Sequence, residues 1–97
     1  GMASYYTVSS SGRVTASGER LRDDLMTCAM REGEFGEEVL VVAENGNSVV
    51  CRINDRGPFV KNRVIDLSRA AMRQLDSRAG LLPVKVFRLG RGALTPN

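Results

Sequence analysis

The chain has 97 residues, of which 42% are hydrophobic and 26% are charged. This length suits a single domain over residues 1–97, and the apolar content excludes a disordered chain because it is enough to form a core. No apolar run reaches the roughly 18 residues of a membrane span. The 14 basic and 11 acidic residues give a net charge of +3 without any block of like charge. So weak a positive charge argues against nucleic acid as a partner.

Short runs of strand-forming residues dominate the sequence. Gly1-Met2 is typical of a start left by processing, and the run Tyr5-Tyr6-Thr7-Val8 then predicts the first strand. Turn residues follow at 9–13 and 17–18. The six strands that we expect cover residues 3–8, 25–30, 38–43, 48–54, 64–67 and 84–89, and the apolar run at 38–43 predicts a buried strand. The polar, glycine-containing tail 90–97 is predicted to fray.

Two local signals complete the expected order of elements. Asn45-Gly46 lies between two β-branched runs and predicts a hairpin, because both central residues of a tight hairpin turn need positive φ. A helix is expected over 69–75, with Ser68 as its N-cap and apolar residues recurring at helical spacing. Leu81-Leu82-Pro83 is then expected to be a connector. Six short strands and one helix predict a small closed barrel, which leaves no exposed edge.

The residue types that are missing restrict the chemistry. The chain has no histidine, which removes Ser–His and Cys–His nucleophile pairs and most catalytic zinc sites. Its glycine-containing stretches lack the spacing of nucleotide-binding loops. We therefore expect no metal and no cofactor, and acid–base chemistry on carboxyl groups remains the main enzymatic option.

Cys28 and Cys51 are the only cysteines, and 23 positions separate them. This spacing excludes a CxxC redox pair, and two cysteines cannot form a structural zinc site alone. Both lie in apolar runs that suggest strands. They are either two buried free thiols or, as the interpretation that we place slightly ahead, one disulfide between neighbouring strands of an exported protein.

Three carboxyl groups stand out beside turns. Asp55 and Asp66 end two strand-like runs among several arginines, and Glu19 follows a glycine turn. In a structural interpretation, the aspartates would bond turn or helix-start amides or pair with Arg52, Arg56 or Arg63. In a functional interpretation, they would supply acid–base chemistry.

These residues belong to longer motifs. The run Arg52-Ile-Asn-Asp-Arg-Gly-Pro-Phe-Val60, followed by Lys61-Asn-Arg-Val-Ile-Asp-Leu-Ser-Arg-Ala-Ala71, closely resembles the double-psi β-barrel domain of the rare lipoprotein A family. Other matching motifs are Ala3-Ser-Tyr-Tyr6, Thr15-Ala-Ser-Gly-Glu19, Phe35-Gly36 and Asn45-Gly46. The resemblance covers nearly the whole chain. It implies a mainly β fold, a six-stranded double-psi β-barrel with one or two short helices and a shallow groove across one face.

The resemblance also implies a function. It points to a septal or cell-wall protein that acts on peptidoglycan as a lytic transglycosylase, with peptide-free glycan strands as its partner. By motif position, the implied catalytic residues are Asp66 as the acid, with Asp55 and Glu19 beside it. The implied substrate-binding residues are Thr15, Arg56, Tyr6 and Asn54. A monomer without a transmembrane segment is expected, exported to the periplasm or cell envelope, or secreted.

Two alternatives follow from one departure from the family pattern. Met30 occupies the position at which the family usually has a histidine. If that histidine takes part in proton transfer, this chain is instead a non-catalytic polysaccharide-binding or expansin-like module. A secreted barrel that binds proteins, such as a protease inhibitor, is the other alternative.

Overall fold

The computed structural model describes residues 1–6 and 14–91, and the architecture that follows is that of these residues. In chain order the elements are β1 (Met2–Tyr5), β2 (Thr27–Ala29), β3 (Glu37–Ala43), β4 (Ser48–Asp55), β5 (Arg63–Leu67), α2 (Arg69–Leu75) and β6 (Leu82–Arg91). The predicted turn at 9–13 and the tail 92–97 lie outside the described residues, as does the end of the strand predicted over 3–8.

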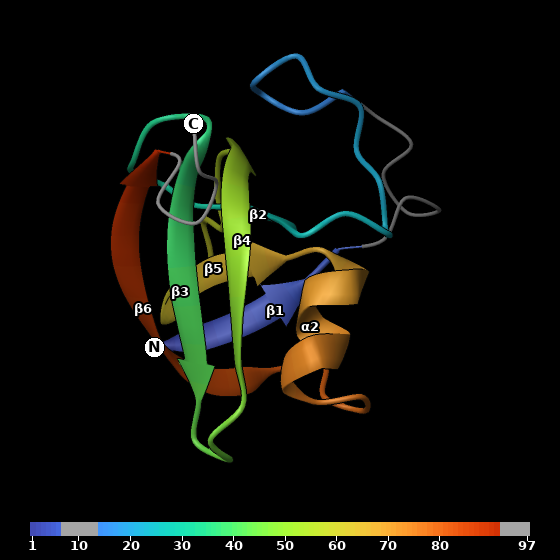
Figure 1. Ribbon diagram of the computed structural model, residues 1–97, viewed down its shortest axis with the longest axis vertical. Coiled ribbons are helices and arrows are strands. Elements are labelled where there is room, and N and C mark those ends of the chain that lie inside the picture. The colour runs from blue at the N-terminus through green and yellow to red at the C-terminus, as the bar shows by residue number, and fades with distance from the viewer. Residues whose placement is uncertain (7–13, 92–97) are drawn as a thin grey trace.

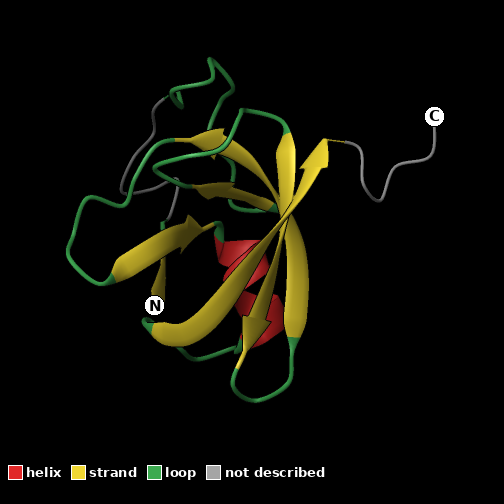
Figure 2. Ribbon diagram, turned by 90° about the vertical axis from the view of Figure 1, so that its left-hand side faces the viewer, coloured by secondary structure: helices red, strands yellow, loops and turns green. Residues whose placement is uncertain are grey.

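The strands close into a barrel in the order β1-β5-β2-β4-β3-β6, as expected from the sequence. β1 pairs with β5 and β2 pairs with β4 in parallel, whereas the other pairs are antiparallel. Figure 1 shows the long strands β3 and β4 side by side, with β1 and β5 crossing behind them. In Figure 2, β6 crosses in front and α2 lies on the opposite side of the barrel. No strand edge is therefore left open along most of the sheet.

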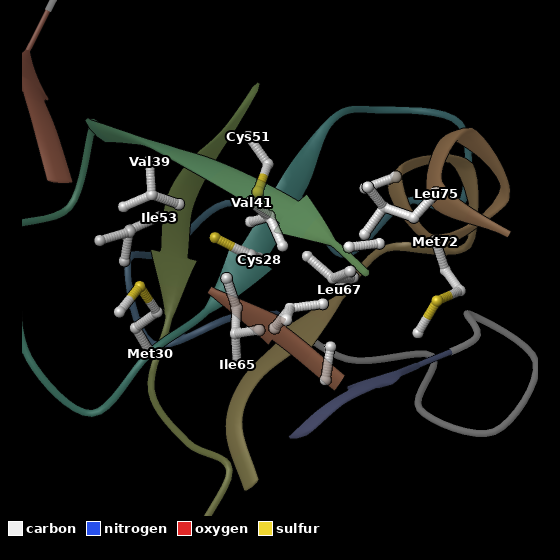
Figure 3. Close-up of a cluster of buried hydrophobic side chains, with 14 residues drawn as sticks. Cys28, Met30, Val39, Val41, Cys51, Ile53, Ile65, Leu67, Met72 and Leu75 are labelled. Carbon is white, nitrogen blue, oxygen red and sulfur yellow. The ribbon is translucent and has the colours of Figure 1, made fainter. Parts of the chain in front are cut away.

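Alternation along the strands fills the barrel interior. In β3, the buried residues Val39 and Val41 alternate with half-buried ones. The sequence predicted a buried strand, whereas the structure buries only one of its two faces. Ile53, Ile65 and Leu67 are fully buried and belong to the same cluster (Figure 3). The β-branched and leucine side chains thus face inward, and their strand neighbours face out.

The predicted hairpin is confirmed, but its turn differs from the expected one. β3 and β4 are joined by four residues, 44–47, and Gly46 has φ +90. Asn45 does not have a positive φ. Its side chain accepts a hydrogen bond from the amide of Asn47, and the amide of Gly46 donates to the carbonyl of Ala43 at 3.1 Å. A longer turn with both backbone and side-chain bonds thus replaces the two-residue turn.

The helix α2 has the bounds that the sequence predicts, and each of its ends is capped. Ser68 is the N-cap, and its hydroxyl accepts a hydrogen bond from the amide of Ala71 at 3.2 Å. At the other end, the side-chain amides of Asn45 and Asn47 both donate to the carbonyl of Leu75. The β3–β4 turn therefore satisfies a carbonyl that the helix leaves unpaired. Among the described residues, no helix is long and apolar enough to cross a bilayer.

The last strand is longer than predicted. Leu82 and Pro83, expected in a connector, already belong to β6 because they pair with Ala3 and Met2 of β1. Gly90 and Arg91, expected in a frayed tail, pair with the start of β3. A proline fits here because it is the second residue of β6, close to the strand start, where a missing amide is tolerated. Pairing with distant strands overrides the local turn signals at both ends.

The two cysteines are free and fully buried in the core (Figure 3), so the disulfide expectation is wrong for this structure. The register places Cys28 opposite Ile53, and Cys51 lies two residues before Ile53 on β4. This offset puts the two Cα atoms about 8 Å apart, beyond the roughly 4.4–6.8 Å that a disulfide requires. Contact with Cys51 and burial raise the pKa of the Cys28 thiol well above its usual range, so it stays protonated.

We expect the Ser68→Ala variant to lower the free energy of unfolding by about 1 kcal/mol, because the amide of Ala71 loses its acceptor. Urea denaturation followed by circular dichroism measures this. Ser77→Ala, which changes an exposed serine just beyond the helix, serves as the matched control. Equal stability of Ser68→Ala and the control would contradict the assignment of Ser68 as a cap.

Candidate functional site

The sheet register brings the two candidate aspartates into one row. Asp66 of β5 pairs with Ala29 of β2, and Ala29 pairs in turn with Asp55 of β4. On the other side, Asp66 pairs with Ser4 of β1. Since neighbouring strands are about 4.8 Å apart, the Cα atoms of the two aspartates are about 10 Å apart. Residues 11 positions apart in the sequence thus share one short row across the barrel.

The side chain of Asp66 lies on the outer face of the barrel. Its strand neighbours Ile65 and Leu67 are fully buried in the barrel interior, so the side chain between them faces the other way. The hydroxyl of Ser4 donates to Asp66 Oδ1 at 3.0 Å. Asp66 is half-buried, and Ser68 rather than Asp66 caps the helix that follows.

Tyr6 lies beside this aspartate. Its hydroxyl shares a hydrogen bond of 2.6 Å with the hydroxyl of Thr27, and the ring is buried. Burial raises the pKa of Tyr6 well above its usual range, and the charge of Asp66 adds to this effect. Tyr6 is thus a neutral phenol near Asp66, held in place by β2.

Asp55 anchors a loop. It is buried, and its Oδ1 accepts hydrogen bonds from the amides of Ala16 and Arg56, each at 2.9 Å. The loop itself is tightened by Thr15, whose amide and hydroxyl both donate to the carbonyl of Glu19 at 2.8 Å. These contacts agree with the structural interpretation of Asp55. They seat the segment 15–19 against the end of β4.

Glu19 is held by an arginine. Both of its carboxylate oxygens accept hydrogen bonds from Arg52, at 2.7 and 2.8 Å, and Asn54 Nδ2 donates to Oε1 at 3.2 Å. The bonds from Arg52, followed by that from Asn54, lower the pKa of Glu19. Glu19 is therefore ionised near neutral pH and cannot donate a proton. Asn54 is buried, and its Oδ1 has no partner among the described residues.

Arg56 contacts Phe35 and the backbone of Met30. The Arg56 guanidinium lies 4.3 Å from the centre of the Phe35 ring and donates to the carbonyl of Met30 at 3.3 Å. Met30 itself belongs to the hydrophobic core. The position of the family histidine is thus filled by a core side chain, and Arg56 joins β4 to the segment before β3.

Five of the predicted site residues are linked by pairwise contacts near the C-terminal ends of β4 and β5. Hydrogen bonds, the register and the charge of Asp66 connect Asp66, Tyr6, Asp55, Asn54 and Glu19. The sequence analysis missed the partners Ser4 and Thr27, and it did not assign Arg52 to Glu19. Nothing local identifies such partners, because each comes from a strand distant in the sequence. No group of three or more acidic, cysteine or histidine side chains in the described part could hold a metal ion.

Comparison with known sequences matches residues 1–86 to the family described as lytic transglycolase. A probable endolytic peptidoglycan transglycosylase RlpA of Nostoc is 50% identical over 95 residues, covering 94% of this chain and 26% of that protein. The endolytic peptidoglycan transglycosylase RlpA of Pasteurella multocida is 44% identical, covering 94% of this chain and 32% of that protein. The chain therefore spans about a quarter to a third of the length of these relatives.

Two solved structures have a similar fold. The expansin of Clavibacter michiganensis superposes with a TM-score of 0.67 at 24% identity, covering 91% of this chain and 48% of that one. The Streptomyces papain inhibitor also gives 0.67, at 22% identity, covering 91% of this chain and 89% of that one. At this level of identity the likeness concerns the barrel alone.

We expect Arg52→Gln to lower the free energy of unfolding at pH 7 by about 0.5–1 kcal/mol, because Glu19 loses a partly exposed ion pair. The folded-state pKa of Glu19 lies below its ordinary value of 4.5, so this contribution is present above 4.5 and disappears as the pH falls through the folded value. The difference between the parent and Arg52→Gln should therefore shrink on going from pH 7 to pH 3, as measured by urea denaturation.

The control for this pair is Arg22→Gln, which breaks the exposed pair between Arg22 and Asp24. It should leave the stability of the parent nearly unchanged at both pH values. A difference between Arg52→Gln and the parent that is the same at pH 3 and pH 7 would show that Glu19 is not the titrating partner.

Proposed function

Because this chain belongs to the lytic transglycolase family, as its motifs predicted, we propose that it cleaves the glycan strands of peptidoglycan as a lytic transglycosylase. The observation that carries the proposal is the outward-facing Asp66, oriented by Ser4 and beside the loop that Asp55 anchors. Peptide-free strands are the proposed substrate. The proposed location is the periplasm or cell envelope, where such strands are found.

The reaction needs one carboxyl group that acts twice. Asp66 first donates a proton to the glycosidic oxygen while the bond from that oxygen to the anomeric carbon breaks. The resulting carboxylate then accepts the proton of the muramic 6-hydroxyl, whose oxygen attacks the anomeric carbon and closes the 1,6-anhydro ring. Asp66 is protonated again at the end. Since the nucleophile belongs to the substrate, no second carboxylate is needed to activate water, as it is in a glycoside hydrolase.

The surroundings of Asp66 support this role. Ser4 orients the carboxyl group, and Tyr6 places a neutral, buried phenol close to it. Both terminal nitrogens of the Arg52 guanidinium donate to the carboxylate of Glu19. The absence of a histidine is compatible with the reaction, because one carboxyl group performs both proton transfers.

The other predicted residues take supporting roles in this proposal. Glu19 and Asp55 are positioning residues, since the first is ionised by Arg52 and the second holds backbone amides. Thr15 stabilises the loop through its bond to the Glu19 carbonyl. Tyr6 lies near Asp66, whereas Asn54 donates to Glu19 and Arg56 contacts Phe35.

We expect Asp66→Asn to reduce the release of 1,6-anhydromuramic ends from peptide-free strands by at least about 100-fold, because the amide neither donates nor accepts the proton. Chromatography of the digestion products with mass spectrometry measures these ends. Asp24→Asn, an exposed aspartate paired with Arg22, is the matched control and should keep the parent activity.

The same experiment separates the alternatives. Cleavage by Asp66→Asn at the parent rate would show that another group is the acid. A parent chain that releases no anhydro ends, yet sediments with sacculi, would instead be a non-catalytic wall-binding module. Binding to a cysteine protease without affinity for sacculi would indicate an inhibitor.

A further inference from the structure

A small polar hollow lies between α2, the segment that follows it and the end of β1. Its volume is about 120 Å³, and three arginines line it: Arg69, Arg73 and Arg78. Tyr5 and Asp76 complete its polar wall. Since a water molecule takes up about 30 Å³ in the liquid, the hollow has room for a group of a few heavy atoms.

These arginines differ from four others that the structure describes. Arg22, Arg52, Arg88 and Arg91 each lie within salt-bridge distance of a carboxylate. Arg69, Arg73 and Arg78 are exposed and form no salt bridge within residues 1–6 and 14–91. The fold thus gathers three guanidinium groups around one hollow, and none of them forms a salt bridge with a carboxylate of the described residues.

Asp76 does not cancel this charge. It is one carboxylate against three guanidinium groups, and its Oδ1 already accepts a hydrogen bond from the amide of Arg78 at 2.9 Å. The hollow therefore keeps a net positive charge of two. Guanidinium groups bind carboxylates through two parallel hydrogen bonds, so a carboxylate suits this site.

The hollow lies next to the proposed reaction site. Arg69 follows Asp66 by three residues, so their Cα atoms are at most about 11 Å apart. Tyr5, which lines the hollow, follows Ser4 in β1, so the side chains of these two residues lie on opposite faces of the strand. The link between the hollow and the reaction site is therefore Arg69, which starts the helix directly after β5.

We propose that this hollow binds the free lactyl carboxylate of a muramic residue in a peptide-free glycan strand. The inference rests on the proposed function. In intact peptidoglycan the lactyl carboxyl group forms an amide with the stem peptide and carries no charge. Removal of the peptide frees one carboxylate on each disaccharide. Arg69, Arg73 and Arg78 thereby select strands from which the peptides have been removed.

The test compares two strand preparations. One is peptide-free strands from amidase-treated sacculi, and the other is the same strands after carbodiimide coupling of the lactyl carboxyl groups to methylamine, which removes their charge. Affinity is measured by fluorescence anisotropy in the Asp66→Asn background, so that the strands remain intact. The protein with all three arginines should bind the carboxylate strands about tenfold more tightly than the amidated strands.

In the same background, Arg69→Gln/Arg73→Gln/Arg78→Gln should bind both preparations alike, with the affinity of the amidated strands. The matched control is Arg31→Gln/Lys61→Gln/Lys85→Gln, which removes three exposed positive charges away from the hollow. This control should retain the tenfold preference. A preference that survives in the first triple variant, or that is lost equally in the control, would overturn the proposal.

A third arm distinguishes the source of the anion. A glycerol-phosphate polymer tests whether the hollow prefers phosphate, and tighter binding of this polymer than of the carboxylate strands would overturn the assignment to lactyl groups. Because affinity is measured without cleavage, its outcome is separate from that of the proposed function. A chain that does not cleave strands can still show the carboxylate preference, and a cleaving chain can lack it.

Discussion

The pairing of β2 with its two neighbours is the constraint on which the site depends. This strand has only three residues, all buried, and it joins β5 on one side to β4 on the other. Each partner contributes one aspartate to the same row, with Ala29 between them. Because strand spacing is fixed by backbone hydrogen bonds, the distance between the two aspartates is set by the sheet and not by flexible loops. The site is therefore preorganised by the backbone.

The acidic residues of the site have different hydrogen-bond partners. Glu19 is ionised because Arg52 binds both of its oxygens, and Asp55 holds the amides of a loop. Asp66 Oδ1 accepts a hydrogen bond from the hydroxyl of Ser4. The three acids are thus held by different groups of the protein.

Local sequence was a good guide wherever neighbours in the chain decide the structure. The helix over 69–75 and its cap Ser68 were predicted correctly, because helix hydrogen bonds and caps join residues within four positions. The β3–β4 hairpin followed from Asn45-Gly46 for the same reason. The start of β6 was predicted wrongly, and the cysteines are two free thiols instead of the disulfide that we placed slightly ahead, since both features depend on the register between strands. The motif match supplied the candidate residues, but it could not reveal their partners.

By itself, the sequence determined the composition of the core, the single helix, the family and the carboxyl groups available for acid–base chemistry. These follow from residue types, their periodicity and motifs that are contiguous in the chain. Only the tertiary structure decided that Ser4 orients Asp66, that Arg52 binds Glu19, and that three arginines surround one hollow beside β1. Each of these contacts depends on a strand register or on the packing of α2, which are long-range properties that no local pattern encodes.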